Sequence, residues 1–239
     1  MIIRKSPQSI AIPQVTHAEL TARLARNLDF TEAGLDYPPE IWFQAVARHD
    51  DGWLLWDRCP EIDPESDTWY NFLDIPAATH LHIWKRSVVA SEGIHPAVSW
   101  WISRHVVRLH DYHDWSAEGL YVRNQAREFK KRQLQLQDDL LPEVRRVPDY
   151  EALDELLAQC DWFSLVLCMG LQQAEIMPMF AENNASLSME SRNEKVRIKP
   201  GKVMKDNLDF HLDAFKIPEE SSISLMECES VRLCWNITS

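Results

Sequence analysis

Residues 47–53 read ARHDDGW and place an adjacent histidine and aspartate at the end of an apolar run that begins at Ile41. His49 follows apolar residues of this run at spacings of three and four, and residues with these spacings share one face of a helix. Its imidazole is therefore expected to point to the buried side. Asp50 lies about 100° further round the same helix, close enough for both side chains to reach one ion. Gly52 is expected to end the helix.

This segment alone leaves two interpretations open. In the first, His49 and Asp50 are ligands of a buried metal site. In the second, a histidine at a helix C-terminus is favoured by the helix dipole, and an Asp-Asp-Gly turn follows it. The choice depends on whether the rest of the chain supplies further buried imidazole and carboxylate groups.

The composition is that of a globular chain with one substantial core. The chain has 239 residues, of which 45% are hydrophobic, and this length is sufficient for a core of that kind. Seven of the ten tryptophans lie between positions 42 and 101, so large aromatic surfaces are expected there. There are only six glycines, and the sequence contains neither a phosphate-binding loop nor a dinucleotide-binding fingerprint.

The net charge of −12 argues against nucleic acid and against anionic membranes as partners, since both bind cationic surfaces. A small phosphorylated substrate stays compatible with this charge if a metal offsets it locally. The five cysteines have no paired zinc-type spacing, and no stretch has the apolar length of a signal peptide or a membrane span. The expected compartment is the reducing cytoplasm.

The spacing of apolar residues predicts a mainly α fold whose helix boundaries are set by caps and prolines. Thr16 and Glu19 have the spacing of a capping box, so a helix is expected from residue 17. Asp149 is expected to cap the last helix, and Pro142 to stop the helix before it. The predicted helices span residues 17–28, 39–50, 77–90, 96–112, 116 or 118 to 141, and 150–171.

The remaining segments predict a small C-terminal antiparallel β element and one long loop. Residues 208–214, 223–225 and 231–235 alternate apolar and polar side chains, as strands do, and residues 2–4 could join them. Residues 54–76 are expected to form a packed loop that covers the site as a lid. The predicted organisation is a helical domain (1–180), a polar loop (181–206) and a β-rich element (207–239) packed on the same domain.

Three further polar residues fall on faces that are expected to be buried. His17 lies on the apolar face of the first predicted helix, and His105 lies on the apolar stripe of the helix at 96–112. Asp161 lies in the most apolar stretch of the chain. A carboxylate there costs several kcal/mol unless it is paired, hydrogen-bonded or bound to a metal. Together with His49 and Asp50, these residues favour a metal site.

The order of a single His17, adjacent His49-Asp50 and a later Asp161 resembles the His-Asp (HD) superfamily of metal-dependent phosphohydrolases. Residues 49–52 resemble its His-Asp-x-Gly motif, and residues 161–165 resemble its last ligand segment. The resemblance implies an HD-like helical bundle in which His17, His49, Asp50 and Asp161 hold the metal. It also implies that Asp50 and His105 act in catalysis, because His105 matches the extra histidine of two-metal members. Trp53 stands where many members have Lys or His.

Over most of its length the chain also resembles an uncharacterised bacterial family, domain-of-unknown-function family 3891. The resemblance is carried by residues 14–18, 47–53 with Trp56-Asp57, 103–105 and 161–168. This family supplies no established activity.

The first functional hypothesis is a metal-dependent hydrolase of a small phosphorylated substrate. Mixed imidazole and carboxylate ligands suit a divalent Mn, Fe, Zn or Ni ion, which can activate water and polarise a phosphoryl oxygen. Arg48, Arg104 and Trp53 are expected to contact the substrate, and His105 to hold a second ion or the substrate.

Two other hypotheses stay open. An HD-like iron oxygenase would use the same ligands, with a second iron held by His105 and one of His80, His82 or His95. A non-catalytic binding protein would instead let the buried histidines and aspartates bond to each other. Whether the chain is an enzyme, its substrate, and its oligomeric state are not determined by the sequence.

Overall fold

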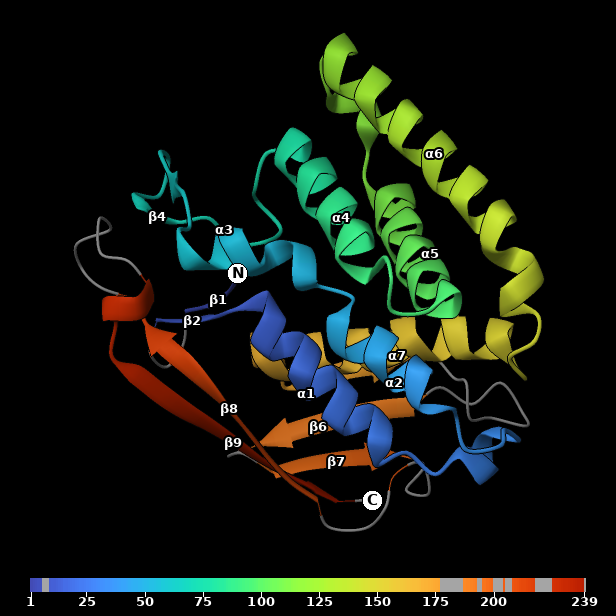
Figure 1. Cartoon of the computed structure of the whole chain (residues 1–239). Helices are drawn as coiled ribbons and strands as arrows, with labels where there is room; N and C mark the ends of the chain where they lie inside the picture. The colour runs from blue at the N-terminus through green and yellow to red at the C-terminus, as the bar shows by residue number, and fades with distance from the viewer. Residues whose placement is uncertain are drawn as a thin grey trace.

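The fold combines a layer of helices with one curled sheet, as seen in a computed structural model that describes residues 1–5, 9–176, 187–192, 195–199, 204, 208–217 and 225–238. Helices make up more of these residues than strands do, which confirms the mainly α prediction. Helix α1 packs on strand β8 (Leu208–Lys216), as Figure 1 shows. Helix α7 packs on β1 (Ile2–Arg4) and β5 (Gln173–Ile176), so these two helices join the layers. The α-helices of the described residues are α1 (Gln14–Arg26), α2 (Glu40–Arg48), α3 (Leu54–Arg58), α4 (Ala77–Ser91), α5 (Pro96–Tyr112), α6 (Leu120–Val144) and α7 (Tyr150–Met169).

The sheet is larger than the small antiparallel element that the sequence predicts. Its strand order is β1-β2-β8-β9-β7-β6-β5. The β7–β9 pair is parallel and the other pairs are antiparallel, so the sheet is mixed. The strands are β1 (Ile2–Arg4), β2 (Ile10–Ile12), β5 (Gln173–Ile176), β6 (Leu187–Arg192), β7 (Lys195–Lys199), β8 (Leu208–Lys216) and β9 (Ser230–Thr238).

The expected polar loop at 181–206 needs correction, because residues 187–192 and 195–199 are strands β6 and β7. The missed signal is the alternation around Val196 and Ile198, which are 0% and 3% exposed between charged neighbours. Residues 181–186, 193–194, 200–203 and 205–206 of the expected loop lie outside the described residues. The strand expected at 223–225 is not confirmed, because residues 223 and 224 also lie outside them and Leu225 begins the 3-10 turn η4 (Leu225–Glu227). Pairing of β8 with β9 confirms two of the expected C-terminal strands.

Helix α1 begins three residues before the predicted start, and Thr16 is not its cap. The N-cap is Pro13, which has no hydroxyl or carboxylate to offer the free N–H groups of the first turn. Asp57 of α3 takes that role, since its carboxylate accepts a 2.6 Å hydrogen bond from the Gln14 backbone N–H. The cap therefore comes from a distant part of the chain.

Three other predicted features differ from the structure. Helix α6 continues past Pro142 to Val144, because proline removes only its own N–H and the following residues still bond to earlier carbonyls, as Arg145 does to Leu141. Asp149 precedes α7 with a positive φ of 54° and makes no side-chain cap. The expected loop at 54–76 begins with α3 and contains the two-stranded sheet of β3 (Ile62–Asp63) and β4 (Thr68–Trp69).

Buried tryptophans connect the helices of the core. Trp42 of α2 and Trp101 of α5 are both 0% exposed. Their indole N–H groups donate 2.9 Å hydrogen bonds to the carbonyls of Leu153 and Tyr150, both on α7. Burial of such a ring stabilises the fold by roughly 3 kcal/mol, and the hydrogen bond removes the cost of burying its N–H.

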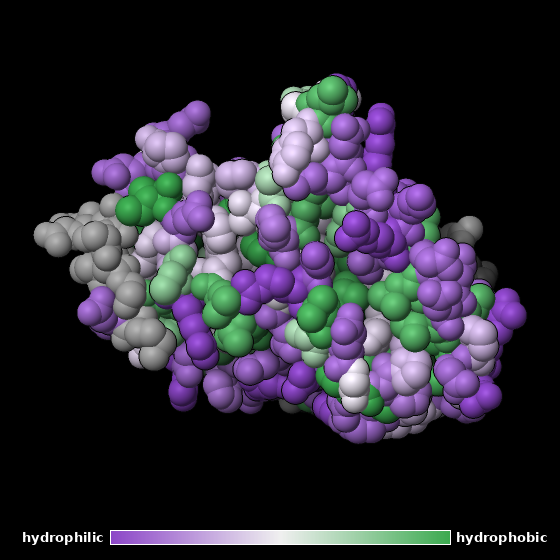
Figure 2. All heavy atoms as spheres, turned by 45° about the horizontal axis from the view of Figure 1, so that its top comes forward, coloured by the Kyte–Doolittle hydropathy of each residue, from purple (hydrophilic) through white to green (hydrophobic). Residues whose placement is uncertain are grey.

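The face in Figure 2 is mostly hydrophilic, with groups of hydrophobic residues among the charged ones. This is the ordinary distribution for a globular protein. Among the described helices, none combines the length and the apolar character needed to cross a bilayer.

Gly52 lies in the 3-10 turn η2 (Asp51–Trp53), which follows α2 and packs against α4. Its backbone N–H donates a 3.0 Å hydrogen bond to the Ser87 hydroxyl. A Cβ atom at this position would lie 2.6 Å from the Ser87 backbone nitrogen. Helix α2 ends at Arg48 with His49 as its C-cap, so the role of Gly52 is close packing and not helix termination.

We expect Gly52→Ala to lower the free energy of unfolding by about 1–3 kcal/mol, because the added methyl group overpacks the contact with α4. Gly119→Ala is the comparison variant, since a Cβ there meets nothing within 4 Å. Gly119 is the N-cap of α6, where alanine is less favourable than glycine, so its effect should stay within about 1 kcal/mol. Urea denaturation of both variants measures the difference. Equal midpoints for the two variants would contradict the close-packing role of Gly52.

Candidate metal centre

Four helical segments bring the predicted site residues together. His17 lies at the end of the first turn of α1, His49 is the C-cap of α2 and Asp50 follows it. His105 lies within α5 and Asp161 within α7. All five are buried, with exposed fractions between 0% and 7%. Asp50 lies just beyond α2 and not on it, yet its side chain still faces the same cluster.

The centre of the cluster is one oxygen of Asp161. Its Oδ1 atom lies 2.8 Å from His17 Nε2 and 3.1 Å from His49 Nε2. Asp50 Oδ2 lies 3.5 Å from His49 Nε2 and 4.0 Å from His17 Nε2. Two imidazole nitrogens and two carboxylates from different segments thus point at one small region.

The opposite nitrogens of the two imidazoles are held by the surrounding chain. His49 Nδ1 lies 2.7 Å from the Val46 carbonyl, which can only accept, so Nδ1 carries a hydrogen and donates it. His17 Nδ1 lies 2.6 Å from the Ser164 hydroxyl, which in turn lies 3.2 Å from the Asp161 carbonyl. When Ser164 donates to that carbonyl, it accepts from His17 Nδ1.

This arrangement leaves the Nε2 lone pair of a neutral His49 facing a carboxylate oxygen. Two electron-rich atoms at 3.1 Å repel unless a positive charge lies between them. Either a proton on Nε2 or a metal ion supplies that charge. Histidines that bind metals commonly donate their other N–H to a carbonyl or a similar acceptor, so the residues present fit a metal ion.

The same geometry shifts the carboxylate pKa values in opposite directions. Burial alone would raise the pKa of Asp161, but the hydrogen bonds from His17 and His49 outweigh burial and hold it well below the usual value. Burial raises the pKa of Asp50, although both histidines oppose the rise. Asp161 is therefore the firmly ionised member of the pair.

His105 differs from the other two histidines. Its Nε2 atom lies 3.9 Å from Asp161 Oδ2, the other oxygen of that carboxylate, and its ring meets His49 edge-on at 4.9 Å between centroids. Its Nδ1 atom is buried without a hydrogen-bond partner in the described part of the chain. Burial lowers the pKa of His105 to about 3, so the ring is neutral.

Two overlapping groups in the described residues have donor atoms close enough to hold an ion. One is His17, His49 and Asp161; the other is His49, Asp50 and His105, with all donor atoms in each group within 4.8 Å of one another. His80, His82 and His95, considered for a second iron, belong to neither group. His80 instead contacts the Phe72 carbonyl, and His95 caps α5.

The three expected substrate contacts have other partners. Arg48 pairs with Asp51 at 3.4 Å on the surface. Arg104 pairs with Asp154 at 3.1 Å. Trp53 is 3% exposed and packs in a small apolar cluster. None of them is among the groups that surround Asp161 Oδ1 in the described residues.

Residues that support the site were not predicted from the sequence. Ser164 bonds to His17, and Thr21 lies 2.6 Å from the Ser164 hydroxyl. Thr21 follows His17 by four positions and Ser164 follows Asp161 by three, and such spacings put both pairs on shared helix faces. Asp154, which is 1% exposed and also bonded by Arg108 at 2.9 Å, was not identified either.

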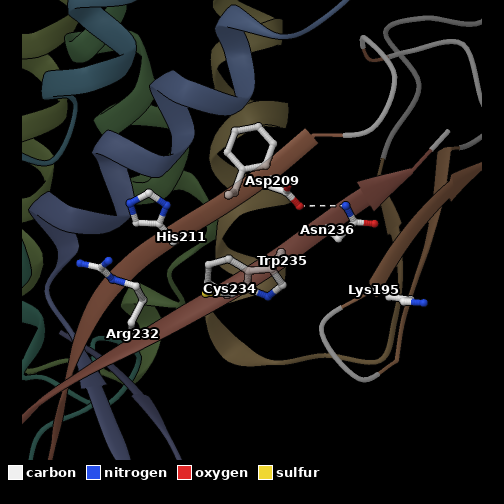
Figure 3. A pocket seen from close by; sticks show the side chains of 8 residues that line it. Lys195, Asp209, His211, Arg232, Cys234, Trp235 and Asn236 are labelled. Carbon is white, nitrogen blue, oxygen red and sulfur yellow. Dashed lines mark hydrogen bonds between the residues drawn. The ribbon is translucent and has the colours of Figure 1, made fainter.

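A separate pocket of about 380 Å³ lies on the sheet, lined by side chains of β7, β8 and β9 (Figure 3). Within it, the Asn236 amide donates a 2.8 Å hydrogen bond to Asp209 (Figure 3). None of the five residues of the candidate centre lines this pocket. The pocket and the candidate centre are therefore different places on the molecule.

With metal removed by a chelator, we expect the free energy of unfolding to fall as the pH rises from 6.5 to 9. Burial alone would lower the pKa of His49, but Asp50 and Asp161 outweigh it and raise this pKa from 6.5 to about 9. The stabilisation that protonated His49 gives is complete below pH 6.5 and is lost as the pH passes its folded-state pKa. The free energy of unfolding then falls by up to about 3 kcal/mol. Urea denaturation across this range measures it.

His49→Gln is the control for this pH dependence, because glutamine has no group that titrates in this range. The variant should lose this fall in the free energy of unfolding between pH 6.5 and 9, and the pH dependence that remains comes from other groups such as the buried Met1 amino group, whose pKa burial lowers. A slope as steep as that of the unchanged protein would assign the effect to other groups.

A comparison with known families matches residues 1–219 to a family model described as "Protein of unknown function (DUF3891)". No curated protein and no solved structure matches the chain. The match covers nearly all of the 239 residues, including every residue of the candidate metal centre. The chain therefore belongs to the DUF3891 family.

Proposed function

We propose that the chain is a metal-dependent hydrolase of a small phosphorylated substrate, with His17, His49, Asp50 and Asp161 as ligands of a divalent Mn, Fe, Zn or Ni ion. One observation carries this proposal. The Nε2 atoms of His17 and His49 both approach Asp161 Oδ1, while the opposite nitrogen of His49 donates to a backbone carbonyl. Buried lone pairs and carboxylate oxygens directed at one point call for a cation.

The donor set favours the named metals over the harder ions. Two imidazole nitrogens suit Mn, Fe, Zn or Ni better than Mg or Ca, which prefer oxygen ligands. When bound, such an ion lowers the pKa of a coordinated water and polarises a phosphoryl oxygen. This is the chemistry that hydrolysis of a phosphate ester requires.

The protein residues have distinct parts in this proposal. Val46 and Ser164 fix the orientation of the two histidine rings through their hydrogen bonds. His17 and His49 are 0% exposed, so they exclude bulk water from one side of the centre. The side chains of Asp50 and Asp161 are 9% and 10% exposed, so the substrate approaches from the carboxylate side.

The negative charge of the molecule limits the size of an anionic substrate. With a net charge of −12, and with Arg48 and Arg104 already paired to aspartates, an anionic substrate depends on the ion for attraction. A small substrate with one or a few phosphates meets that condition, whereas a long polyanion would meet repulsion from the acidic surface. An HD-like iron oxygenase is the alternative enzyme, and iron as the bound metal would favour it.

We expect purified, untagged protein to contain a stoichiometric divalent metal, measured by elemental analysis. His49→Ala and Asp161→Ala should abolish it, because each removes a ligand and leaves its partner unpaired. His82→Ala is the matched control, since His82 is an exposed histidine of α4 outside both donor groups, and it should keep the metal.

The metal-loaded protein should hydrolyse p-nitrophenyl phosphate or bis(p-nitrophenyl) phosphate, and the two ligand variants should not. Iron with oxygen-dependent colour changes would redirect the search to oxygen chemistry. Protein that stays metal-free after incubation with Mn, Fe, Zn and Ni would overturn the proposal and leave a non-catalytic binding protein, in which the buried groups only bond to each other.

A further inference from the structure

We infer that the centre holds a single ion and that His105 is not one of its ligands but borders the position left open for water and substrate. This inference rests on the proposed function, because it assigns roles around the same ion. It decides between the two roles that the sequence leaves open for His105, a second ion or the substrate.

The number of lone pairs on His49 limits the number of ions that the centre can hold. Both donor groups, His17/His49/Asp161 and His49/Asp50/His105, include His49. Its Nδ1 atom is committed as a donor to the Val46 carbonyl, so only Nε2 has a lone pair for a metal. One lone pair binds one ion. The two groups are therefore alternatives and cannot both be occupied.

The geometry favours the donor group that contains His17, His49 and Asp161. The Nε2 atoms of His17 and His49 approach the same oxygen of Asp161, at 2.8 and 3.1 Å, and Asp50 Oδ2 lies within 4.0 Å of both nitrogens. An ion placed among these atoms replaces every unfavourable contact with a ligand bond. For a second ion, His105 would be the one nitrogen ligand within the described residues. Its other ligands would be the carboxylate oxygens that the first ion does not use.

The imidazole of His105 lacks the hydrogen bonds that hold the rings of His17 and His49. The opposite nitrogens of His17 and His49 have partners in Ser164 and Val46, as is usual for metal ligands. The Nδ1 atom of His105 has no hydrogen-bond partner in the described residues, and its Nε2 atom lies 3.9 Å from the other oxygen of Asp161. The histidine that lacks outer support is the one suited to contact exchangeable groups.

The side chains of the centre differ in their exposure to solvent. The side chains of Asp50, Asp161 and His105 reach solvent at 9%, 10% and 3%, whereas those of His17 and His49 are at 0%. Among the five side chains of the centre, those of Asp50, Asp161 and His105 are therefore the ones in contact with solvent. His105 is placed to donate a hydrogen bond to the incoming group or to accept one from it.

The test counts ions and measures affinity with Co²⁺ as the probe, by elemental analysis and by visible absorption during titration of the metal-free protein. The unchanged protein should bind one Co²⁺ per chain. His105→Ala should keep that ion with a dissociation constant within about threefold, whereas His17→Ala should weaken binding by ~100-fold or more, since even outer partners of ligands are worth 10–100-fold. His82→Ala is the control for loss of any histidine.

Two Co²⁺ ions per unchanged chain would overturn the inference and leave the proposed function standing. A hundredfold weaker binding by a folded His105→Ala would also overturn it. If alanine at this buried position disturbs folding, judged by the thermal melt, His105→Gln replaces it and the ion count of the unchanged protein still decides. Protein that binds no ion would overturn the proposed function itself.

The role of His105 toward substrate has its own readout. On a substrate found in the phosphatase screen, Co²⁺-loaded His105→Ala should lose about 100-fold or more in kcat while it keeps its ion, as expected for loss of a group that exchanges a proton or hydrogen bond with the reacting atoms. Unchanged turnover in the loaded variant would contradict the placement of His105 at the open position.

Discussion

The buried carboxylate of Asp161 is the constraint on which the rest of the structure depends. An ionised group in this apolar part of α7 costs several kcal/mol unless opposite charge or hydrogen bonds compensate it. The compensation comes from His17 on α1 and His49 at the end of α2, both within 3.1 Å of one oxygen. These three segments must therefore meet at one place, and α5 joins them through His105. The polar cluster thus connects four segments that are far apart in the sequence.

The surrounding structure holds these segments in place by contacts that are distant in sequence. Asp57 satisfies the first N–H of α1, which has only a proline as its cap. Trp42 bonds from α2 to the Leu153 carbonyl of α7, and Gly52 lets the turn after His49 approach α4 closely. Each contact fixes one segment that carries a site residue. The chemistry of the centre and the stability of the helical layer thus depend on the same set of contacts.

Much of the helical layer could be predicted from the sequence because its signals are local. The apolar spacing and Pro96 give α5 its observed bounds, and α4 and α7 end within two residues of their predicted ends. The start of α1 could not be predicted, because its cap is a carboxylate 43 positions away. Strands β6 and β7 were missed because their polar residues suggested a loop, and the parallel pairing of β7 with β9 has no local signal.

The sequence by itself determined which residues of the candidate centre are buried, since periodicity places His17, His49, His105 and Asp161 on apolar faces. Only the tertiary structure decided how they meet, because a ligand set is defined by distances between atoms of different helices. In the tertiary structure, His17 and His49 both contact Asp161 Oδ1, and His105 lies closer to Oδ2 of the same carboxylate. Arg104 pairs with Asp154. Helical spacing specifies the face of a side chain, whereas the partner on that face is fixed by the packing of one helix against another.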